Sequence, residues 1–148
     1  MTPPSRDVDR AAAKLAELSH SSGLSTFGEV SAVLGFAQSI VYSSDLDTTG
    51  HEDYWRFPVE TMYEQTGDCE DTSILAAAVL RRLGHNVAIA VMPEHAALGV
   101  EAPPGIPGHF ATVHGHRMYY CETTAAGFFV GELPDSVDPD SITWVSLP

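Results

Sequence analysis

Basic residues are scarce in this sequence of 148 residues. Seven Lys and Arg stand against 20 Asp and Glu, so the formal net charge at pH 7 is −13. No basic stripe is available to neutralise phosphates, which argues against nucleic acid as a partner. The same charge argues against docking on an anionic membrane surface. Solubility is the common reason for such a charge.

Cysteines and long apolar runs are also lacking. Two cysteines cannot build the disulfide framework of a small secreted domain. No apolar run approaches the roughly 18 residues of a membrane-spanning helix, and the N-terminal residues show no signal-peptide pattern. We therefore expect a cytoplasmic protein, or an excised domain of a larger one, with no membrane insertion in this chain.

The overall composition is that of an ordinary globular domain. Hydrophobic residues make up 44% and charged residues 18% of the chain, and this length is typical of one domain with its own core. We expect a single domain over 1–148, with a flexible lead-in at 1–5 and a C-terminal extension at 135–148. No pattern indicates an oligomeric state.

Helical patterns come first along the chain and strand patterns second. Apolar spacing predicts helices over 7–20, from 25 or 26 to about 40, and over 69–83, with an irregular stretch over 43–67. Strands are predicted over 87–92 and 95–101, in a hairpin of 110–113 with 117–123, and over 128–130 and 142–145. This order predicts an α+β fold with a mainly antiparallel sheet.

Cys69 is the most informative residue, because it stands at the predicted first turn of the third helix. Backbone N–H groups there favour a thiolate and can stabilise the oxyanion of an acyl intermediate. However, Asp68, Glu70 and Asp71 surround it with negative charge. A thiolate at neutral pH therefore needs an imidazolium partner. A buried structural cysteine is the other interpretation.

Two later residues can complete a catalytic set with Cys69. His95 opens a predicted strand, and the small residues Ala97 and Gly99 on its face leave room for a neighbouring helix. Glu122, in a later strand, needs a partner if it is buried. Nucleophile, base and orienting acid would then come from a helix start and two strands. Cys121 should point to the opposite face, into the core.

The stretch from Phe57 to Leu75, with Gly-Asp-Cys-Glu-Asp at its centre, resembles the nucleophile motif of transglutaminase-like domains, within the papain-like superfamily. The similarity continues through Arg-Arg-Leu-Gly at the helix end, His-Ala-Ala-Leu-Gly-Val from His95, and Tyr-Cys-Glu-Thr-Thr around Glu122. It covers the chain from about Phe36 to Pro134. The resemblance implies that the nucleophile-bearing helix packs on the antiparallel sheet.

Residue by residue, the resemblance implies that Cys69 is the nucleophile, His95 the general base and Glu122 the acid that orients His95. It also gives Asp68 and Asp71 capping and structural roles. The family's third member is commonly Asp before Pro-Thr, whereas this chain has Glu before Thr-Thr. The implied activity is acyl transfer on amide bonds of a protein or peptide through a thioester, without a cofactor or metal. The breadth of the family favours a peptidase or amidase over protein crosslinking.

An oxyanion hole needs a second donor besides the N–H of Cys69. Gln38, on the predicted second helix, is one candidate, and Trp55 and Tyr54 are others through their indole N–H and phenol O–H. A polar helix surface explains Gln38 equally well, and aromatic cover over the core explains the other two.

Two groups of residues resemble metal sites in part. The acids from Asp45 onward match positions 1, 3 and 9 of a calcium loop, but position 12 falls on Arg56, where an EF-hand needs Glu. His109, His114 and His116 match no structural zinc spacing. A metal-dependent hydrolase using these histidines remains one alternative function, and a non-catalytic transglutaminase-like binding module remains another.

Acidic residues cluster next to the proposed thiol. Five acids lie between Glu60 and Asp71, and others, including Glu52, precede them. If these acids surround the entrance of the site, they favour neutral or cationic peptides. The loop over 103–108, rich in Pro and Gly, is expected to border the cleft.

Overall fold

A computed structural model describes residues 5–23, 25–51 and 53–147. The three predicted long helices are present as α1 (Arg6–Ser21), α2 (Thr26–Gln38) and α5 (Cys69–Arg82). Serine caps begin the first two, because Ser5 accepts a hydrogen bond from Val8 N–H and Ser25 from Gly28 N–H. Most of the expected lead-in, and Glu52 of the acidic segment, lie outside the described residues.

The stretch over 43–67 is more regular than its sequence suggests. It contains two short helices, α3 (Asp45–Thr49) and α4 (Pro58–Glu64). On either side of them, β1 (Val41–Tyr42) pairs in parallel with β2 (Thr66–Gly67). The prediction of an irregular stretch was wrong because helices of one or two turns show no apolar period.

A five-stranded antiparallel sheet follows the helices, in the order β5-β6-β4-β3-β7. Its strands are β3 (Val87–Met92), β4 (His95–Glu101), β5 (Phe110–Val113), β6 (His116–Cys121) and β7 (Thr143–Ser146). The predicted strand over 128–130 does not form, because these residues turn back beside β6. β6 also ends one residue before Glu122. The C-terminal segment contributes β7 to the sheet edge next to β3.

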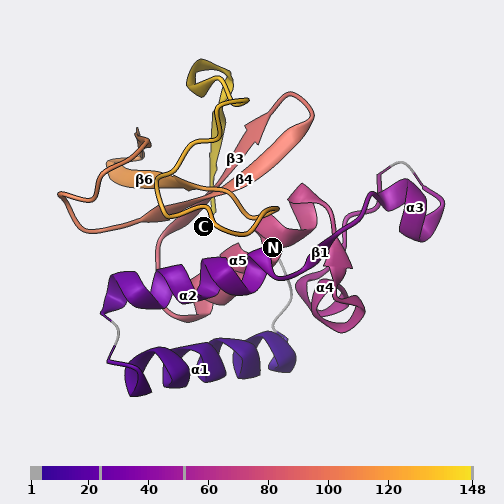
Figure 1. Cartoon of the computed structure of the whole chain (residues 1–148), viewed down its shortest axis with the longest axis horizontal. Coiled ribbons are helices and arrows are strands. Elements are labelled where there is room, and N and C mark those ends of the chain that lie inside the picture. The colour runs from indigo at the N-terminus through magenta and orange to yellow at the C-terminus, as the bar shows by residue number, and fades with distance from the viewer. Residues whose placement is uncertain (1–4, 24, 52, 148) are drawn as a thin grey trace.

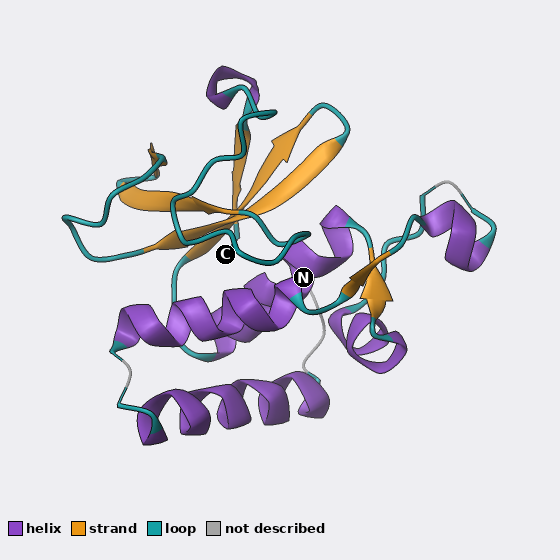
Figure 2. Ribbon diagram, in the orientation of Figure 1, coloured by secondary structure: helices purple, strands orange, loops and turns teal. Residues whose placement is uncertain are grey.

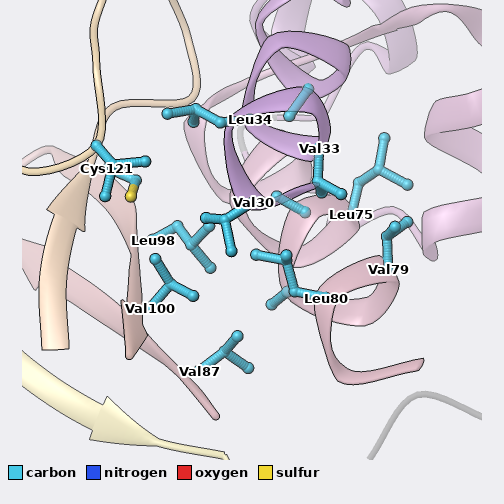
Figure 3. Packing of buried hydrophobic residues seen from close by; sticks show 14 of the residues in the cluster. Val30, Val33, Leu34, Leu75, Val79, Leu80, Val87, Leu98, Val100 and Cys121 are labelled. Atoms are coloured by element: carbon cyan, nitrogen blue, oxygen red, sulfur yellow. The ribbon is translucent and has the colours of Figure 1, made fainter. Parts of the chain in front are cut away.

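The hydrophobic core lies between one face of the sheet and the helices. In Figures 1 and 2, α1, α2 and α5 lie together on one side of the strands. Figure 3 shows Leu80 of α5 facing Val100 of β4, with Leu98 of β4 between this pair and Cys121 of β6. Cys121 is fully buried there, as the sequence predicted. This packing fixes the start of α5 relative to the first residues of β4.

The opposite face of the sheet is covered by the C-terminal part of the chain. Ala97, expected to leave room for a helix, packs in a small cluster with Tyr120 and Trp144. A Cβ added at Gly99 would overlap the Trp144 ring. The small residues therefore accommodate the indole of β7, and the expectation of a helix on this face was wrong. No described helix is both long and apolar enough to cross a lipid bilayer.

Candidate active site

Cys69 is the first residue of α5, and a capping box holds it there. Asp68 accepts a hydrogen bond from Asp71 N–H at 3.1 Å, and Asp71 accepts one from Asp68 N–H at 3.3 Å. Gly67 is required before this turn, because an added Cβ would lie 2.8 Å from the Asp71 Cβ. The sulfur lies near the start of β4, where the backbone of Ala96 is close enough to lower the pKa of the thiol.

The Cys69 thiol is hydrogen-bonded to a carboxylate. Cys69 Sγ donates to Glu70 Oε2 at 3.0 Å. Burial, together with this bond and the Glu70 charge, raises the pKa of Cys69 to about 12, although the Ala96 N–H opposes the rise. The resting thiol is therefore neutral at physiological pH. Sequence reasoning counted Glu70 as one charge in a cluster and missed its direct contact with the sulfur.

His95 and Glu122 form a hydrogen-bonded pair. His95 Nε2 lies 2.9 Å from Glu122 Oε2, and Glu122 is 3% exposed. The carboxylate has further donors: Tyr120 Oη at 3.0 Å, Thr124 N at 3.2 Å and Thr124 Oγ1 at 2.7 Å. Four bonds hold the carboxylate in one orientation, so the longer Glu side chain reaches the imidazole in a fixed geometry.

The pKa shifts of the pair have opposite signs, and both favour the charged forms of the two groups. The hydrogen bond with Glu122 raises the pKa of His95, although burial opposes it. Burial alone would raise the pKa of Glu122, but the bonds from His95 and Thr124 outweigh it and lower that pKa to about 2. Each partner therefore favours the charged form of the other. The ring nitrogen that faces away from Glu122, Nδ1, is the one available to exchange a proton with a substrate or a thiol.

The structure brings Cys69, His95 and Glu122 into one region, but hydrogen bonds do not connect all three. Cys69 touches the residue after His95, and His95 touches Glu122, but no hydrogen bond joins Cys69 to His95 among the described residues. In the resting protein the thiol proton points to Glu70. A proton transfer from Cys69 to His95 therefore requires a change of thiol rotamer.

The candidate oxyanion donors are placed differently from expectation. Gln38 Nε2 donates to the carbonyl oxygens of Glu122 at 2.9 Å and Phe128 at 3.0 Å, so both amide hydrogens are in use. It braces the chain behind Glu122 and has no hydrogen left for an oxyanion. Tyr54 donates to Glu60. Trp55 is 71% exposed and bonds to no described residue, so its role stays a prediction.

Tyr42 is a nearby residue that sequence reasoning missed. It lies on β1, directly opposite Gly67 in the register. Burial, followed by the charges of Cys69, Asp68 and Glu70, raises the pKa of Tyr42, so the phenol keeps its proton. No sequence signal marked it, because only the β1–β2 pairing brings position 42 beside Cys69.

A pocket of about 470 Å³ opens on the His95 side of the site. His95 and Glu122 line it, with Met92 and Phe128 among the apolar residues and Asp138 as a further acid. Cys69 is not a lining residue, and neither is the loop over 103–108, which was expected to border the cleft. The C-terminal segment that covers this face of the sheet supplies one wall.

In the part of the chain that the structure describes, the histidines proposed for zinc do not form a cluster with the spacing of metal ligands. His116 bonds to Glu101, and His114 occupies a turn with a positive φ of 49°. Among the described residues, the only cluster with cation-ligand spacing is formed by Asp45, Asp68 and Asp71. A metal-dependent hydrolase built on these histidines has no support in the structure.

The arrangement of helices and sheet is similar to that of solved structures of LapG from Legionella pneumophila. The EGTA-treated form matches 95% of this chain and 77% of that chain, with a TM-score of 0.54 and 19% identity. The calcium-bound form matches 93% and 83%, with a TM-score of 0.51 and 19% identity. A structure described as a TGase matches 83% of this chain and 34% of that chain, with a TM-score of 0.49 and 16% identity. No family model and no curated protein matches the sequence.

These similarities define the class of fold. The chain has a transglutaminase-like α+β fold, as its sequence predicted, with the cysteine-bearing helix α5 packed against an antiparallel sheet. At 19% identity, the LapG structures establish the fold alone.

Proposed function

We propose that this protein is a cysteine-dependent enzyme that transfers acyl groups from amide bonds of peptides or proteins, and that it hydrolyses rather than crosslinks. The observation that carries the proposal is the His95–Glu122 pair beside a cysteine at a helix N-terminus. A buried carboxylate with four donors, aligned on an imidazole, is the arrangement that a general base needs.

The reaction begins with a proton transfer that the substrate must induce. When the thiol turns from Glu70 to His95, His95 Nδ1 takes its proton and the sulfur attacks the amide carbon. The C–N bond then breaks, the leaving amine takes the proton from His95, and the acyl group stays on the sulfur as a thioester. Water, deprotonated by His95, attacks the thioester and releases the acid and the thiol. Glu122 stabilises the imidazolium in both halves.

The oxyanion formed in each half needs two donors. The Cys69 N–H is one, since it donates to no described residue at the start of α5. The Tyr42 hydroxyl is the second that we propose, because the phenol lies near the same helix turn and stays protonated. It takes the place that sequence reasoning gave to Gln38.

The pocket beside His95 receives the leaving-amine half of the substrate. His95 gives its proton to that half, and the pocket is lined by His95 and not by Cys69. Its charged lining residues are His95, Glu122 and Asp138, so no lining residue attracts an anion except His95, which Glu122 already engages. Neutral and cationic peptides are therefore the proposed substrates.

One LapG structure is calcium-bound, so we consider whether this chain has a calcium site. The acidic cluster of Asp45, Asp68 and Asp71 is the place where this chain could hold one. The residues do not fit, because the guanidinium of Arg56 already bonds to Asp45 at 2.9 Å and to Asp71 at 2.7 Å. No step of the proposed reaction uses a metal.

The test is hydrolysis of a library of amide substrates by variants of the site. Cys69→Ala and His95→Ala should lose at least about a thousandfold in kcat/KM, whereas Cys121→Ala, which keeps the site thiol, should retain activity. Glu122→Gln should lose about a hundredfold or more, and Glu122→Asp should recover part of it. Hydrolysis that survives Cys69→Ala contradicts the proposal.

One observation favours a second candidate, a transglutaminase-like binding module without catalysis. The thiol is bonded to Glu70 and has a pKa of about 12. In that case no amide substrate is turned over, and a thiol-reactive probe labels Cys69 no faster than a free cysteine, with no dependence on His95. Labelling of Cys69 that falls when His95 is replaced separates the enzyme from the module.

A further inference from the structure

Arg56 has its whole side chain enclosed by the molecule. The residue is 2% exposed, although it lies in a connecting segment between two short helices. A buried guanidinium is costly unless each of its N–H groups has an acceptor. Here the acceptors come from three helices.

The partners of Arg56 are mostly carboxylates. Nη1 donates to Asp45 Oδ1 at 2.9 Å and to Asp71 Oδ2 at 2.7 Å, and Nε donates to Glu64 Oε2 at 2.9 Å. Nη2 donates to the Thr48 hydroxyl. Asp45 and Thr48 belong to α3, Glu64 to α4 and Asp71 to α5, so one guanidinium joins three helices. Figure 1 labels these helices.

Each carboxylate oxygen of Asp45 and Asp71 already accepts a hydrogen bond. Asp45 Oδ2 accepts from Tyr54 N–H at 2.7 Å, and Asp71 Oδ1 accepts from the backbone N–H of Arg56 at 3.0 Å. Together with the guanidinium bonds, all four oxygens of Asp45 and Asp71 therefore have an N–H partner. A metal ion would have to displace the buried guanidinium to reach them.

The cluster is also connected to the start of α5. Asp71, which Arg56 holds through both its side chain and its backbone, accepts the Asp68 N–H in the capping box that precedes Cys69. Without a cation, the carboxylates of Asp45 and Asp71, both buried, would repel each other at this point.

We propose that Arg56 is an internal cation that takes the place of a bound divalent metal ion at the Asp45–Asp68–Asp71 cluster, and so frees this chain from dependence on calcium. Arg56 is a positioning residue: it acts through Asp71 on the turn that carries Cys69. The inference does not depend on the proposed enzyme activity, because it is tested on stability and metal binding.

The first experiment measures the wild-type protein. Equilibrium dialysis against calcium and thermal unfolding in EGTA or in millimolar calcium should show no stoichiometric binding and no change in Tm. The second measures Arg56→Ala, which should lower Tm by about 10 °C, since it leaves buried carboxylates unpaired. Arg81→Ala, an exposed arginine of α5, is the matched control and should leave Tm nearly unchanged.

The decisive readout is a gain of calcium response. Once the guanidinium is removed, the freed oxygens should bind calcium, so millimolar calcium should restore about half or more of the lost Tm in Arg56→Ala. The double variant Asp45→Asn/Arg56→Ala should lose this rescue. Arg56→Lys, which keeps the charge with fewer donors, should fall between wild type and Arg56→Ala in Tm and show no rescue.

Several results would overturn the proposal. Stoichiometric calcium binding by the wild type, or a fall of its Tm in EGTA, shows that Arg56 does not replace a metal. If Arg56→Ala folds and calcium does not change its Tm, Arg56 has a structural role only and does not replace a metal ion. If Arg56→Ala folds in calcium but not in EGTA, the proposal is supported; if it folds in neither and Arg56→Lys matches Arg81→Ala in Tm, it is wrong.

Discussion

At the scale of single residues, the site combines a base that is already oriented, His95, with a nucleophile that is still protonated, Cys69. Glu122 fixes His95 and raises its pKa, whereas Glu70 holds the Cys69 proton and helps raise the thiol pKa to about 12. Both acids raise the pKa of the group to which they are hydrogen-bonded, but the consequences differ: the raised pKa favours the charged imidazolium of His95 and the neutral thiol of Cys69. The resting state is thus protected from adventitious oxidation and alkylation, which require the thiolate.

Glu70→Gln tests the hold on the thiol. It removes a negative charge that raises the pKa of Cys69 and replaces one carboxylate oxygen by an NH2 donor, so the thiolate fraction at pH 8 should rise about tenfold for each unit by which the pKa falls. The rate of alkylation by iodoacetamide, measured in a Cys121→Ala background, reports that fraction. Glu17→Gln, an exposed acid on α1, serves as control; an equal rate for both variants contradicts the assignment.

Tyr42→Phe tests the proposed second oxyanion donor. Removal of one such donor typically costs about a hundredfold to a thousandfold in kcat, with a smaller effect on KM. Tyr42 is largely exposed, so the substitution should leave Tm within about 2 °C of wild type. Tyr63→Phe, on the exposed surface of α4, is the matched control. Unchanged kcat in Tyr42→Phe would remove the phenol from the mechanism.

At the scale of elements, the long segments were predictable and the short ones were not. Apolar periodicity located α1, α2 and α5, and the strand patterns located β3 and β4 at their observed bounds. Residues Cys69, His95 and Glu122 could be selected because their chemistry and order follow a recognisable pattern. Arg56 and Tyr42 could not, since their roles arise from α3, α4 and the β1–β2 pair, which bring distant positions together without any local period.

The turn before α5 depends on a close approach that only glycine permits. In Gly67→Ala, the added Cβ would collide with Asp71, which Arg56 holds from the other side, so unfolding should become easier by about 1–3 kcal/mol. Gly35→Ala is the matched control, because nothing lies within 4 Å of its added Cβ and alanine favours helix α2 by about 0.5–1 kcal/mol. Urea unfolding of both variants measures the difference; equal stability of the two would refute the close approach.

At the scale of the whole molecule, the acidity is partly internal. Asp45, Asp71 and Glu122 are buried and bonded, so they contribute to the net charge of −13 without facing solvent. These acids therefore act inside the protein, and Asp138, an exposed residue that lines the pocket, is the acid that a substrate would meet. Electrostatic steering of cationic peptides should accordingly be weaker than the sequence suggests.

The buried groups also set opposite dependences of stability on pH. The pKa of Glu122 is lowered to about 2, so its contribution is present above its unfolded pKa and is lost as pH falls through about 2. Burial and neighbouring acids raise the pKa of Asp68 to about 7, so the folded state binds more protons there and loses stability as pH rises toward 7. The pKa of His95 is also raised, so its contribution is lost as pH rises through that value.

These signs predict that the protein is most stable in mildly acidic solution, with Tm rising from pH 2 to about pH 4–5 and falling from about pH 5 to pH 8. The general repulsion among 20 acids acts in the same direction above pH 5, but 0.5 M NaCl screens it, whereas it screens buried pairs much less. Thermal unfolding in high salt therefore isolates the buried groups. Glu122→Gln should flatten the rise at low pH, and Asp68→Asn should flatten the fall toward pH 7. A wild-type Tm that stays constant from pH 5 to pH 8 in high salt contradicts the roles given to Asp68 and His95.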